Sequence, residues 1–351
     1  MKTAKLLYKL YLKHAKLNAQ TQFSSVLADS LLKHNSSSFW KTWNSKFCTK
    51  SVCSSCVDAC SGNADIAQRF KTVFADIYSP NNPIVHDDAN KDLLAMLSAC
   101  DNSVYNVNIS VDDVESAILL LRKGKAPGFD EITLEHIMYA HPVLIICIKN
   151  LFTIMFHCSY VPDAFGHGIL IPLLKGSDCD PTNSGNYRGL TLSPIFSKIF
   201  EHVLLLKFSN YFEASDLQFG FKKNIGCSDA LLCLRSVVSY FNKNGNTVNI
   251  ACLDVSKAFD KVCSSILFIK LIKRGCPKFL VAILYNWYNK CSVSVRWNNV
   301  YSDIFTVCAG VRQGGIMSPV LFAIYIDNMI IRLKDSKLGC VIDGYYFGCL
   351  L

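Results

Sequence analysis

The sequence lacks a long, uninterrupted apolar run and a secretory leader. A membrane-spanning helix needs about 20 consecutive apolar residues, and the longest candidate, residues 142–162, is interrupted by Lys149, Asn150 and His157. The N-terminus is rich in lysine and has neither the apolar core nor the small-residue cleavage site of a signal peptide. We therefore expect an intracellular protein of the nucleus or cytoplasm, with no membrane partner.

The chain also lacks a complete set of cysteine or histidine pairs for zinc, although it contains 17 cysteines. At 351 residues it is long enough to bury a core without disulfide bonds. Cys48, Cys53, Cys56 and Cys60 cluster in a serine-rich stretch, and the Cys-x-x-Cys within it resembles half of a zinc knuckle. No second pair follows at the usual spacing. We interpret these four residues as free thiols and keep zinc binding as the alternative.

Acidic residues are nearly absent from the first 50 residues. Nine lysines and one acid, Asp29, give this segment a formal charge of +8, close to the +9 of the whole chain. A helix of that sign attracts phosphate groups or an anionic membrane surface, and lysines near nucleic acid gain from the release of counterions. A solvated helix face explains the same pattern, so nucleic-acid binding is one of two interpretations.

The composition, 51% hydrophobic, is typical of a globular chain, and the sequence pattern divides it into three parts. We expect a lysine-rich helical extension with a Cys/Ser-rich linker at 1–63, a helix and a linker at 64–109, and a compact domain at 110–351. In the middle part, the helix is expected at 65–78, and the proline-containing stretch 79–90 is expected to be a linker.

The compact part alternates capped helices with short β-like runs. Ser110 and Asp113 predict a capping box for a helix that ends at Gly124. Further helices are expected after Ser-Pro or Ser-Asp pairs, at 195–212, 230–242 and 320–333. Strands are expected at 169–174, 248–253, 292–297, 305–307, 340–342 and 345–351, with Asp343-Gly344 as a hairpin turn between the last two. This order predicts an α+β fold with an antiparallel sheet.

Two of the predicted strands end at residues suited to phosphoryl chemistry. The strand 248–253 runs into Asp254, and a carboxylate that leaves a sheet there is placed to bind a metal ion, although a strand-end aspartate is more often a turn former. The strand 169–174 runs into Lys175, and Arg188 follows thirteen residues later. A point charge and a planar fork suit a polyphosphate. Solvation at the surface is the alternative for both side chains.

A glycine-rich loop at 309–317 is the third candidate segment. Its glycines allow the backbone to approach a flat or anionic ligand closely, and Gln313 offers both a donor and an acceptor. The loop matches neither the G-x-x-x-x-G-K-[ST] nor the G-x-G-x-x-G pattern of phosphate-binding loops. Taken alone, it is equally compatible with an ordinary loop.

Together these segments resemble the reverse transcriptase domain of non-LTR (LINE-type) retrotransposons over most of residues 110–351. The first matching block is G-K-A-P-G-F-D, and the second contains I-P-L-L-K and N-Y-R. The five blocks that match the family in order are 124–130, 171–192, 218–221 with 227–230, 253–260, and 310–319. Five ordered blocks at the family's spacing are not expected by chance.

The resemblance implies a right-hand polymerase fold with fingers and a partial palm, and RNA-directed DNA synthesis on an RNA template from a DNA primer. Asp254 would bind two Mg²⁺ ions, with the backbone of Val255 near the second ion. Lys175 and Arg188 would hold the triphosphate of the incoming dNTP. Phe259 would lie under the incoming sugar and exclude a 2′-hydroxyl group.

The resemblance also assigns the glycine-rich loop, where Gln313 and Gly314 would line the template and the nascent base pair. Three positions depart from the family pattern. Gly189 and Arg312 stand where the family has proline, and Met317 stands where leucine is common. We expect these changes to alter rigidity rather than to remove ligands.

The end of the sequence departs more strongly from the family. Residues 339–351 resemble the strand that leads into the family's Tyr/Phe-Ala-Asp-Asp turn, but residues 1–351 contain neither that motif nor a thumb. Asp343 is better explained as a turn former than as a substitute ligand. We therefore expect a truncated chain that is inactive alone, because one carboxylate cannot hold two ions about 4 Å apart. An RNA-binding remnant and a remnant without function are the alternatives.

Overall fold

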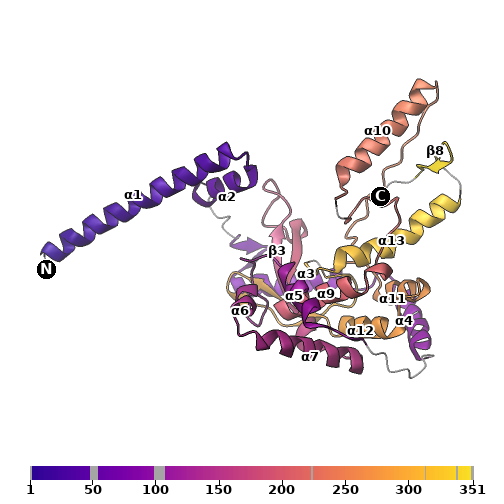
Figure 1. The fold of residues 1–351 in the computed structure, drawn as a ribbon, viewed down its shortest axis with the longest axis horizontal. Helices are drawn as coiled ribbons and strands as arrows, with labels where there is room; N and C mark the ends of the chain where they lie inside the picture. Colours follow the sequence, from indigo (N-terminus) through magenta and orange to yellow (C-terminus); the bar gives the residue numbers. More distant parts are fainter. Residues whose placement is uncertain are drawn as a thin grey trace. The chain divides into compact units, whose positions relative to one another are not determined.

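The computed structural model describes residues 2–47, 54–98, 107–222, 224–312, 314–336 and 339–348. The chain divides into two compact units, Met1–Ser54 and Ser55–Leu351. The first unit consists of α1 (Lys2–Leu32) and α2 (Ser36–Phe47), which confirms the predicted helical segment apart from a short break (Figure 1). The Asn35 side chain accepts a hydrogen bond from the Ser38 backbone N–H and so begins α2. Within the described ranges, no helix is long and apolar enough to span a bilayer.

The second unit contains a five-stranded sheet. Its strands are β3 (His167–Leu174), β4 (Tyr187–Leu192), β5 (Ser292–Trp297), β6 (Val300–Tyr301) and β7 (Phe305–Thr306). The order is β4-β3-β5-β6, with β7 also paired to β5. β3 and β4 are antiparallel, but β3 and β5 run parallel. The predicted antiparallel sheet is therefore only partly correct, because helices lie between β4 and β5 in the chain and carry it back across the sheet.

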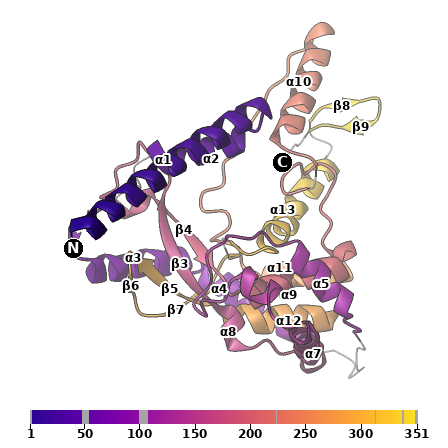
Figure 2. The same cartoon turned by 60° about the vertical axis from the view of Figure 1, so that its left-hand side comes forward.

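One face of this sheet is covered by α3 (Asn63–Ile77), as Figure 2 shows. Phe70 and Phe74 of α3 pack in the same buried cluster as Leu170, Tyr187 and Trp297 from the strands. A small hairpin of β1 (Cys56–Val57) and β2 (Cys60–Ser61) precedes this helix. The segment that follows residue 55 therefore belongs to the core of the second unit.

The hairpin of β1 and β2 carries two of the four clustered cysteines, Cys56 and Cys60. Cys48 and Cys53 lie outside the described residues, so zinc binding stays a prediction. The hairpin turn contains Asp58, whose carboxylate accepts hydrogen bonds from the Ser184 N–H (3.0 Å) and hydroxyl (2.5 Å) and from Arg69 Nε (2.8 Å). These bonds join the hairpin to α3 and to the loop before β4.

The expected linker at 79–90 is wrong for most of its length, because α4 (Pro83–Ser98) begins within it. Proline is favourable at the first position of a helix, where its missing N–H costs no hydrogen bond. The Asn82 side chain accepts a hydrogen bond from the Val85 N–H and so caps the first turn. α4 then packs against α11 (Ser264–Lys273), with Leu93 fully buried.

Most of the remaining helices build the larger hydrophobic core, and Figures 1 and 2 show α7, α9 and α12 gathered beside the sheet. The helices of this core are α5 (Val111–Leu119), α6 (Leu134–Met138), α7 (Val143–Cys158), α8 (Asp163–Gly166), α9 (Ile195–Lys207), α12 (Lys278–Tyr288) and α13 (Ser318–Asp335). Among the described residues, the helix α10 (Cys227–Lys243) contributes none to this buried cluster. Phe152, Phe200 and Trp287 are at most 1% exposed in this core. The packing fixes the positions of α9 and α13, which flank the candidate site.

The predicted helix start at 195 is confirmed, whereas α10 begins at Cys227 and α13 at Ser318, two to three residues before the predicted starts at 230 and 320. Some predicted ends are also wrong. The Ser110–Asp113 capping box is present, but α5 ends at Leu119 rather than at Gly124. The apolar run beyond Ile118 does not continue the buried face of the helix, because Leu119 is 77% exposed. Similarly, α9 ends at Lys207, and a short 3₁₀ turn, Ser209–Tyr211, replaces its predicted last turn.

The predicted strand at 248–253 is wrong. Residues 246–255 have no regular secondary structure, and Leu253 is 83% exposed. A strand is stabilised by hydrogen bonds to a neighbour, and none of the described strands pairs with this segment. In contrast, the hairpin of β8 (Val341–Ile342) and β9 (Tyr345–Tyr346) is confirmed, with Asp343 and Gly344 both at positive φ as a tight hairpin turn requires. The second strand is shorter than the predicted 345–351, because it ends at Tyr346, and residues 349–351 lie outside the described residues.

Candidate active site

Lys175 and Arg188 lie on one face of the β3–β4 hairpin. Arg188 is paired with Leu173 across the strands, and the Lys175 N–H bonds to the Asn186 carbonyl just beyond β3. In an antiparallel ladder, two directly opposed residues lie on the same face, and so do residues two positions apart along one strand. This face is exposed, whereas the other face is covered by α3. The register therefore gives the two predicted phosphate ligands a common, accessible surface.

Their present partners leave both cations accessible. The Lys175 ammonium donates a hydrogen bond to the Gly185 carbonyl at 2.8 Å. Among the described residues, Arg188 forms no ion pair. Neither charge is neutralised by a carboxylate, so an anionic ligand would meet no competing acid.

The glycine-rich loop is packed against two other motif blocks. The Gly310 N–H donates to the Val262 carbonyl (2.7 Å), and the Val311 N–H donates to the Phe259 carbonyl (2.8 Å). A Cβ atom on Gly310 would lie 2.8 Å from the Asp260 carbonyl oxygen. The loop thus requires glycine at this position because it lies directly on the backbone of 259–262.

A second glycine fixes the loop against the end of β4. Gly314 has a φ of 112°, and a Cβ atom there would lie 2.4 Å from the Thr191 carbonyl oxygen. Gln313, the neighbouring residue, lies outside the described residues. Gly310 and Gly314 together bring the loop, the 253–260 block and the strand that carries Arg188 to one place.

A buried ion pair, which the sequence analysis did not identify, supports this loop from below. Arg312 and Glu201 of α9 are 2.5 Å apart and nearly inaccessible to solvent. Glu201 also accepts hydrogen bonds from the backbone N–H groups of Ile316 and Met317. Burial alone would lower the pKa of Arg312, but the Glu201 carboxylate, with smaller effects of Cys291 and Tyr288, outweighs burial and raises that pKa above its ordinary value. Arg312 stands where the resemblance gives the family a proline. Its side chain therefore holds the loop through an ion pair, and its effect is not limited to the rigidity of the loop.

A second buried carboxylate, Asp327 of α13, holds the segment 215–221. It accepts hydrogen bonds from the Ser215 N–H (3.0 Å) and from Gln218 Nε2 (2.6 Å), and it forms an ion pair with Arg274. Gln218 also donates to the Ala323 carbonyl at 2.9 Å. The glutamine of the third motif block is thus a structural anchor to α13.

Phe259 lies in an aromatic group that joins two motif blocks and α13. Its ring stacks on Phe322 of α13 at 4.6 Å between centroids and meets the edge of Phe221 at 5.7 Å. Phe259 is half-buried, so part of it remains available to a ligand. The predicted role at the sugar is untested by this arrangement.

The predicted metal ligands do not form a complete site. Asp254 and Val255 are exposed and lie outside any strand. In the described part of the chain, no group of three His, Cys, Asp or Glu side chains lies close enough to hold a metal ion. One carboxylate and one backbone carbonyl do not meet the needs of two divalent ions. Asp343 occupies the turn between β8 and β9, as the sequence pattern indicates.

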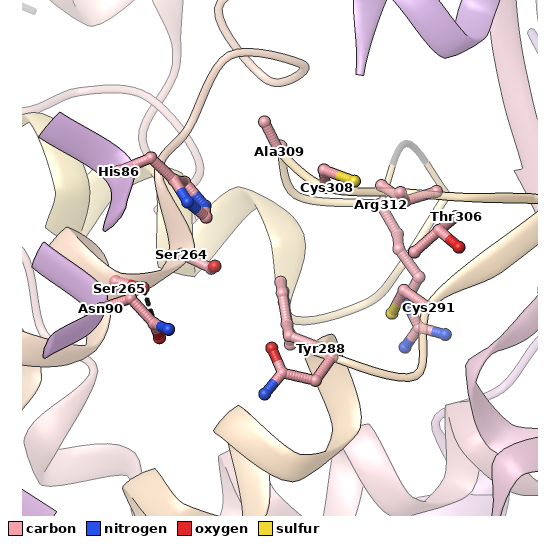
Figure 3. A pocket seen from close by; sticks show the side chains of 13 residues that line it. His86, Asn90, Ser264, Ser265, Tyr288, Cys291, Thr306, Cys308, Ala309 and Arg312 are labelled. Atoms are coloured by element: carbon pink, nitrogen blue, oxygen red, sulfur yellow. Dashed lines mark hydrogen bonds between the residues drawn. The ribbon is translucent and has the colours of Figure 1, made fainter. Parts of the chain in front are cut away.

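A cavity of about 180 Å³ lies beside the glycine-rich loop, and most of its other lining residues had no role in the sequence analysis (Figure 3). His86 and Asn90 of α4 face the start of α11 and the loop that carries Cys308. The Nε2 atom of His86 is buried and has no hydrogen-bond partner among the described residues. No local sequence signal indicated this cavity, because its residues come from four separate segments.

The end of α3 also reaches the site. The Ala309 N–H donates to the Tyr78 carbonyl at 2.8 Å, and Lys261 Nζ donates to the Ser79 carbonyl at 2.9 Å. Burial, together with the nearby Asp260 carboxylate, raises the pKa of the Tyr78 hydroxyl, while a hydrogen bond to Thr191 opposes that change. Residues well before the first motif block therefore support the segments that carry the site.

Comparison with known proteins identifies similar sequences. Residues 175–347 match the family described as reverse transcriptase (RNA-dependent DNA polymerase). The chain is 25% identical over 256 residues to the Pol polyprotein of the type-2 retrotransposable element R2DM of Drosophila melanogaster, covering 70% of this chain and 24% of that protein. It is also 25% identical over 225 residues to the RNA-directed DNA polymerase from the mobile element jockey of the same species, covering 63% and 24%.

A shorter match is closer in sequence. Over 114 residues, the chain is 30% identical to the Pol polyprotein of a type-1 retrotransposable element R2 of Popillia japonica, covering 31% of this chain and 18% of that protein. The chain thus spans about a quarter of the length of the two Drosophila relatives.

Proposed function

The chain carries the reverse transcriptase domain of a non-LTR retrotransposon, and from this premise we propose that it contributes the fingers and part of the palm of an RNA-directed DNA polymerase. The observation that supports this most strongly is the packing of the glycine-rich loop. Gly310 lies on the backbone of Asp260, and Gly314 lies on Thr191, so three motif blocks from distant parts of the sequence meet. The substrates proposed are an RNA template, a DNA primer and a dNTP.

Lys175 and Arg188 are proposed to bind the triphosphate of the dNTP. Their common exposed face and the absence of an acidic partner for either among the described residues support this assignment. Their contribution is charge neutralisation, since phosphoryl transfer depends mainly on positioning and electrostatics. Gln313 and Gly314 are proposed to line the template and the nascent base pair, and Phe259 to select against a 2′-hydroxyl group.

Reverse transcriptases use divalent metal ions, and Asp254 with the Val255 carbonyl are the ligands we assign to Mg²⁺ in this chain. These two donors do not make a two-ion site, so further carboxylates are needed for catalysis. We propose that residues 1–351 alone bind substrates without extending a primer. The sequence-based division at residues 63 and 109 stays a proposal.

The polymerase proposal is tested by binding. The affinity of residues 1–351 for a fluorescent RNA template with a DNA primer is measured without nucleotide, with the complementary dNTP and with a non-complementary dNTP. Binding that is tightened only by the complementary dNTP supports a templated nucleotide site. Equal effects of the two nucleotides, or no binding of the template and primer, contradict it.

A second candidate function is RNA binding by the lysine-rich segment without catalysis. The formal charge of +8 within residues 1–50 favours it. Because Met1–Ser54 forms a compact unit of its own, we expect a chain without residues 1–50 to fold, which circular dichroism checks. Loss of salt-dependent RNA binding on deletion of residues 1–50 supports this function. Unchanged binding after the deletion rules it out.

A further inference from the structure

A small cavity lies between the first motif block and the start of α9, at the opposite end of β4 from Arg188. Its volume is about 60 Å³, which is room for roughly four to six atoms of water size. Gly128 forms one wall: a Cβ atom there would lie 2.8 Å from the Pro194 nitrogen. The glycine of the G-K-A-P-G block is thus needed for the close approach that shapes this cavity.

A buried hydroxyl group lines the cavity without a partner. Ser193 is 1% exposed, and its Oγ atom forms no hydrogen bond with any described residue. A buried polar group that is left unpaired lowers stability. A polar ligand in the cavity would accept or donate the missing hydrogen bond.

The cavity also meets the N-terminus of α9, a helix of 13 residues. No side chain caps this end, and no acidic residue lies in the first turn. The free backbone N–H groups and the helix dipole favour an anion at such an end.

Three cationic side chains complete the lining: Arg122, Lys125 and Lys198. None of them forms an ion pair within the described part of the chain. Burial and the Arg312 charge lower the pKa of Lys198, and the nearby charges of Glu201 and Asp130 only partly offset these effects. An anion in the cavity would add negative charge next to these three cations.

We propose that this cavity binds a phosphate group, held by the Ser193 hydroxyl, the N-terminus of α9, and the cations Arg122, Lys125 and Lys198. It is separate from the proposed triphosphate site, because Arg188 and Ser193 are five residues apart along the chain, or about 16 Å of extended strand. The phosphate comes from a nucleic-acid backbone or from a free nucleotide. The site does not depend on the polymerase proposal, since it requires no catalysis.

The test uses the full chain and three variants, Lys198→Met, Arg122→Gln and Ser193→Ala. Lys273→Met is the matched control, because Lys273 is an exposed lysine in the last turn of α11, away from the cavity. Affinity for a single-stranded RNA oligonucleotide is measured over a range of salt concentrations. If a backbone phosphate binds, Lys198→Met weakens binding roughly tenfold for every RNA sequence and reduces the salt slope by about 0.7.

Thermal unfolding with added inorganic pyrophosphate or dNTP distinguishes the two sources. If Lys198→Met leaves RNA binding unchanged but removes the stabilisation by pyrophosphate or dNTP, the ligand is the phosphate of a nucleotide instead. Ser193→Ala guards against a folding defect, because its hydroxyl has no hydrogen-bond partner to lose among the described residues. This variant is expected to weaken phosphate binding without lowering the melting temperature measured in the absence of ligand. The proposal is overturned if the Lys198 and Ser193 variants match the wild type, or if Lys273→Met weakens binding equally.

Discussion

The Glu201 carboxylate and the Arg312 guanidinium form a buried ion pair, 2.5 Å apart, beneath the glycine-rich loop. Arg312 also donates to the Phe165 carbonyl at 3.1 Å and lies over the Trp287 ring. The Glu201 carboxylate also accepts a hydrogen bond from the Ile316 N–H. It therefore connects α9 with the loop at two positions, Arg312 and Ile316.

Replacing this carboxylate is predicted to destabilise the fold strongly. Glu201→Gln keeps the side-chain volume but leaves Arg312 as an uncompensated buried charge. We expect the free energy of unfolding, measured with urea, to fall by about 3–5 kcal/mol. A double variant, Glu201→Leu with Arg312→Met, is expected to recover part of this loss because it removes both charges.

The control for this prediction is the exposed ion pair between Lys290 and Asp163, 3.0 Å apart with Asp163 81% exposed. Asp163→Asn is expected to change the free energy of unfolding by less than about 1 kcal/mol. If Glu201→Gln costs no more than Asp163→Asn, the buried pair does not support the loop.

The close approach of Gly314 to β4 is tested by adding a single methyl group. Gly314→Ala would place a Cβ atom 2.4 Å from the Thr191 carbonyl oxygen, whereas Gly245→Ala, also at positive φ, would meet nothing within 4 Å. Backbone strain at positive φ costs about 1 kcal/mol or more at both positions. Urea unfolding should therefore show a larger loss for Gly314→Ala, and equal losses would mean that the loop does not lie against β4.

Local signals in the sequence predicted the parts of the fold that depend on neighbouring residues. The Ser110–Asp113 capping box and the Asp343-Gly344 turn need only three or four residues, and both are present. The strand at 248–253 was predicted from the same kind of local pattern but failed, because a strand needs a partner from elsewhere.

The candidate site was predictable only in part, for the same reason. The strand that leads into Lys175 was predicted, but the strand β4 that carries Arg188 was not, so the pairing of Arg188 with Leu173 could not be anticipated. Glu201 and Arg312 are 111 positions apart, and no periodicity connects them. α4 was missed because its polar residues and Pro83 resemble a linker, while its packing on α11 is a tertiary contact.

The hydrogen bonds of Asp58 predict a pH dependence of stability. Hydrogen bonds from the Ser184 hydroxyl and N–H, together with Arg69, lower the pKa of this carboxyl below its ordinary value, although burial opposes them. Its stabilising contribution is therefore complete above the unfolded pKa, near pH 4, and is lost as the pH falls through the lower folded value. Asp58→Asn should destabilise the protein by about 1–3 kcal/mol at pH 7.

The measurement for this prediction is urea unfolding of wild type and Asp58→Asn at pH 7 and at pH 2.5. The difference between the two proteins should be smaller at the lower pH, because protonation of the wild-type carboxyl begins to remove the charge that the Asp58→Asn variant lacks at every pH. A difference that stays constant between the two pH values would show that the carboxylate charge is not responsible.

The lone carboxylate Asp254 leads to a prediction about catalysis. Residues 1–351 contain no Tyr/Phe-Ala-Asp-Asp sequence, and two divalent ions need more than one carboxylate. A primer-extension assay with RNA template, dNTPs and Mg²⁺ should give no product above background. Robust extension that disappears in Asp254→Ala would refute this prediction and show that other residues complete the site.

The central claim is that Lys175 and Arg188 hold the triphosphate on the exposed face of the β3–β4 hairpin in a reverse transcriptase domain. The most direct measurement is the dissociation constant of the complementary dNTP in the presence of RNA template and DNA primer. Lys175→Met with Arg188→Met should weaken dNTP binding by roughly a hundredfold, about 1.4 kcal/mol for each lost charge. Lys243→Met, an exposed lysine of α10, should leave it unchanged. Equal dNTP affinity in the double variant and the wild type would contradict the account.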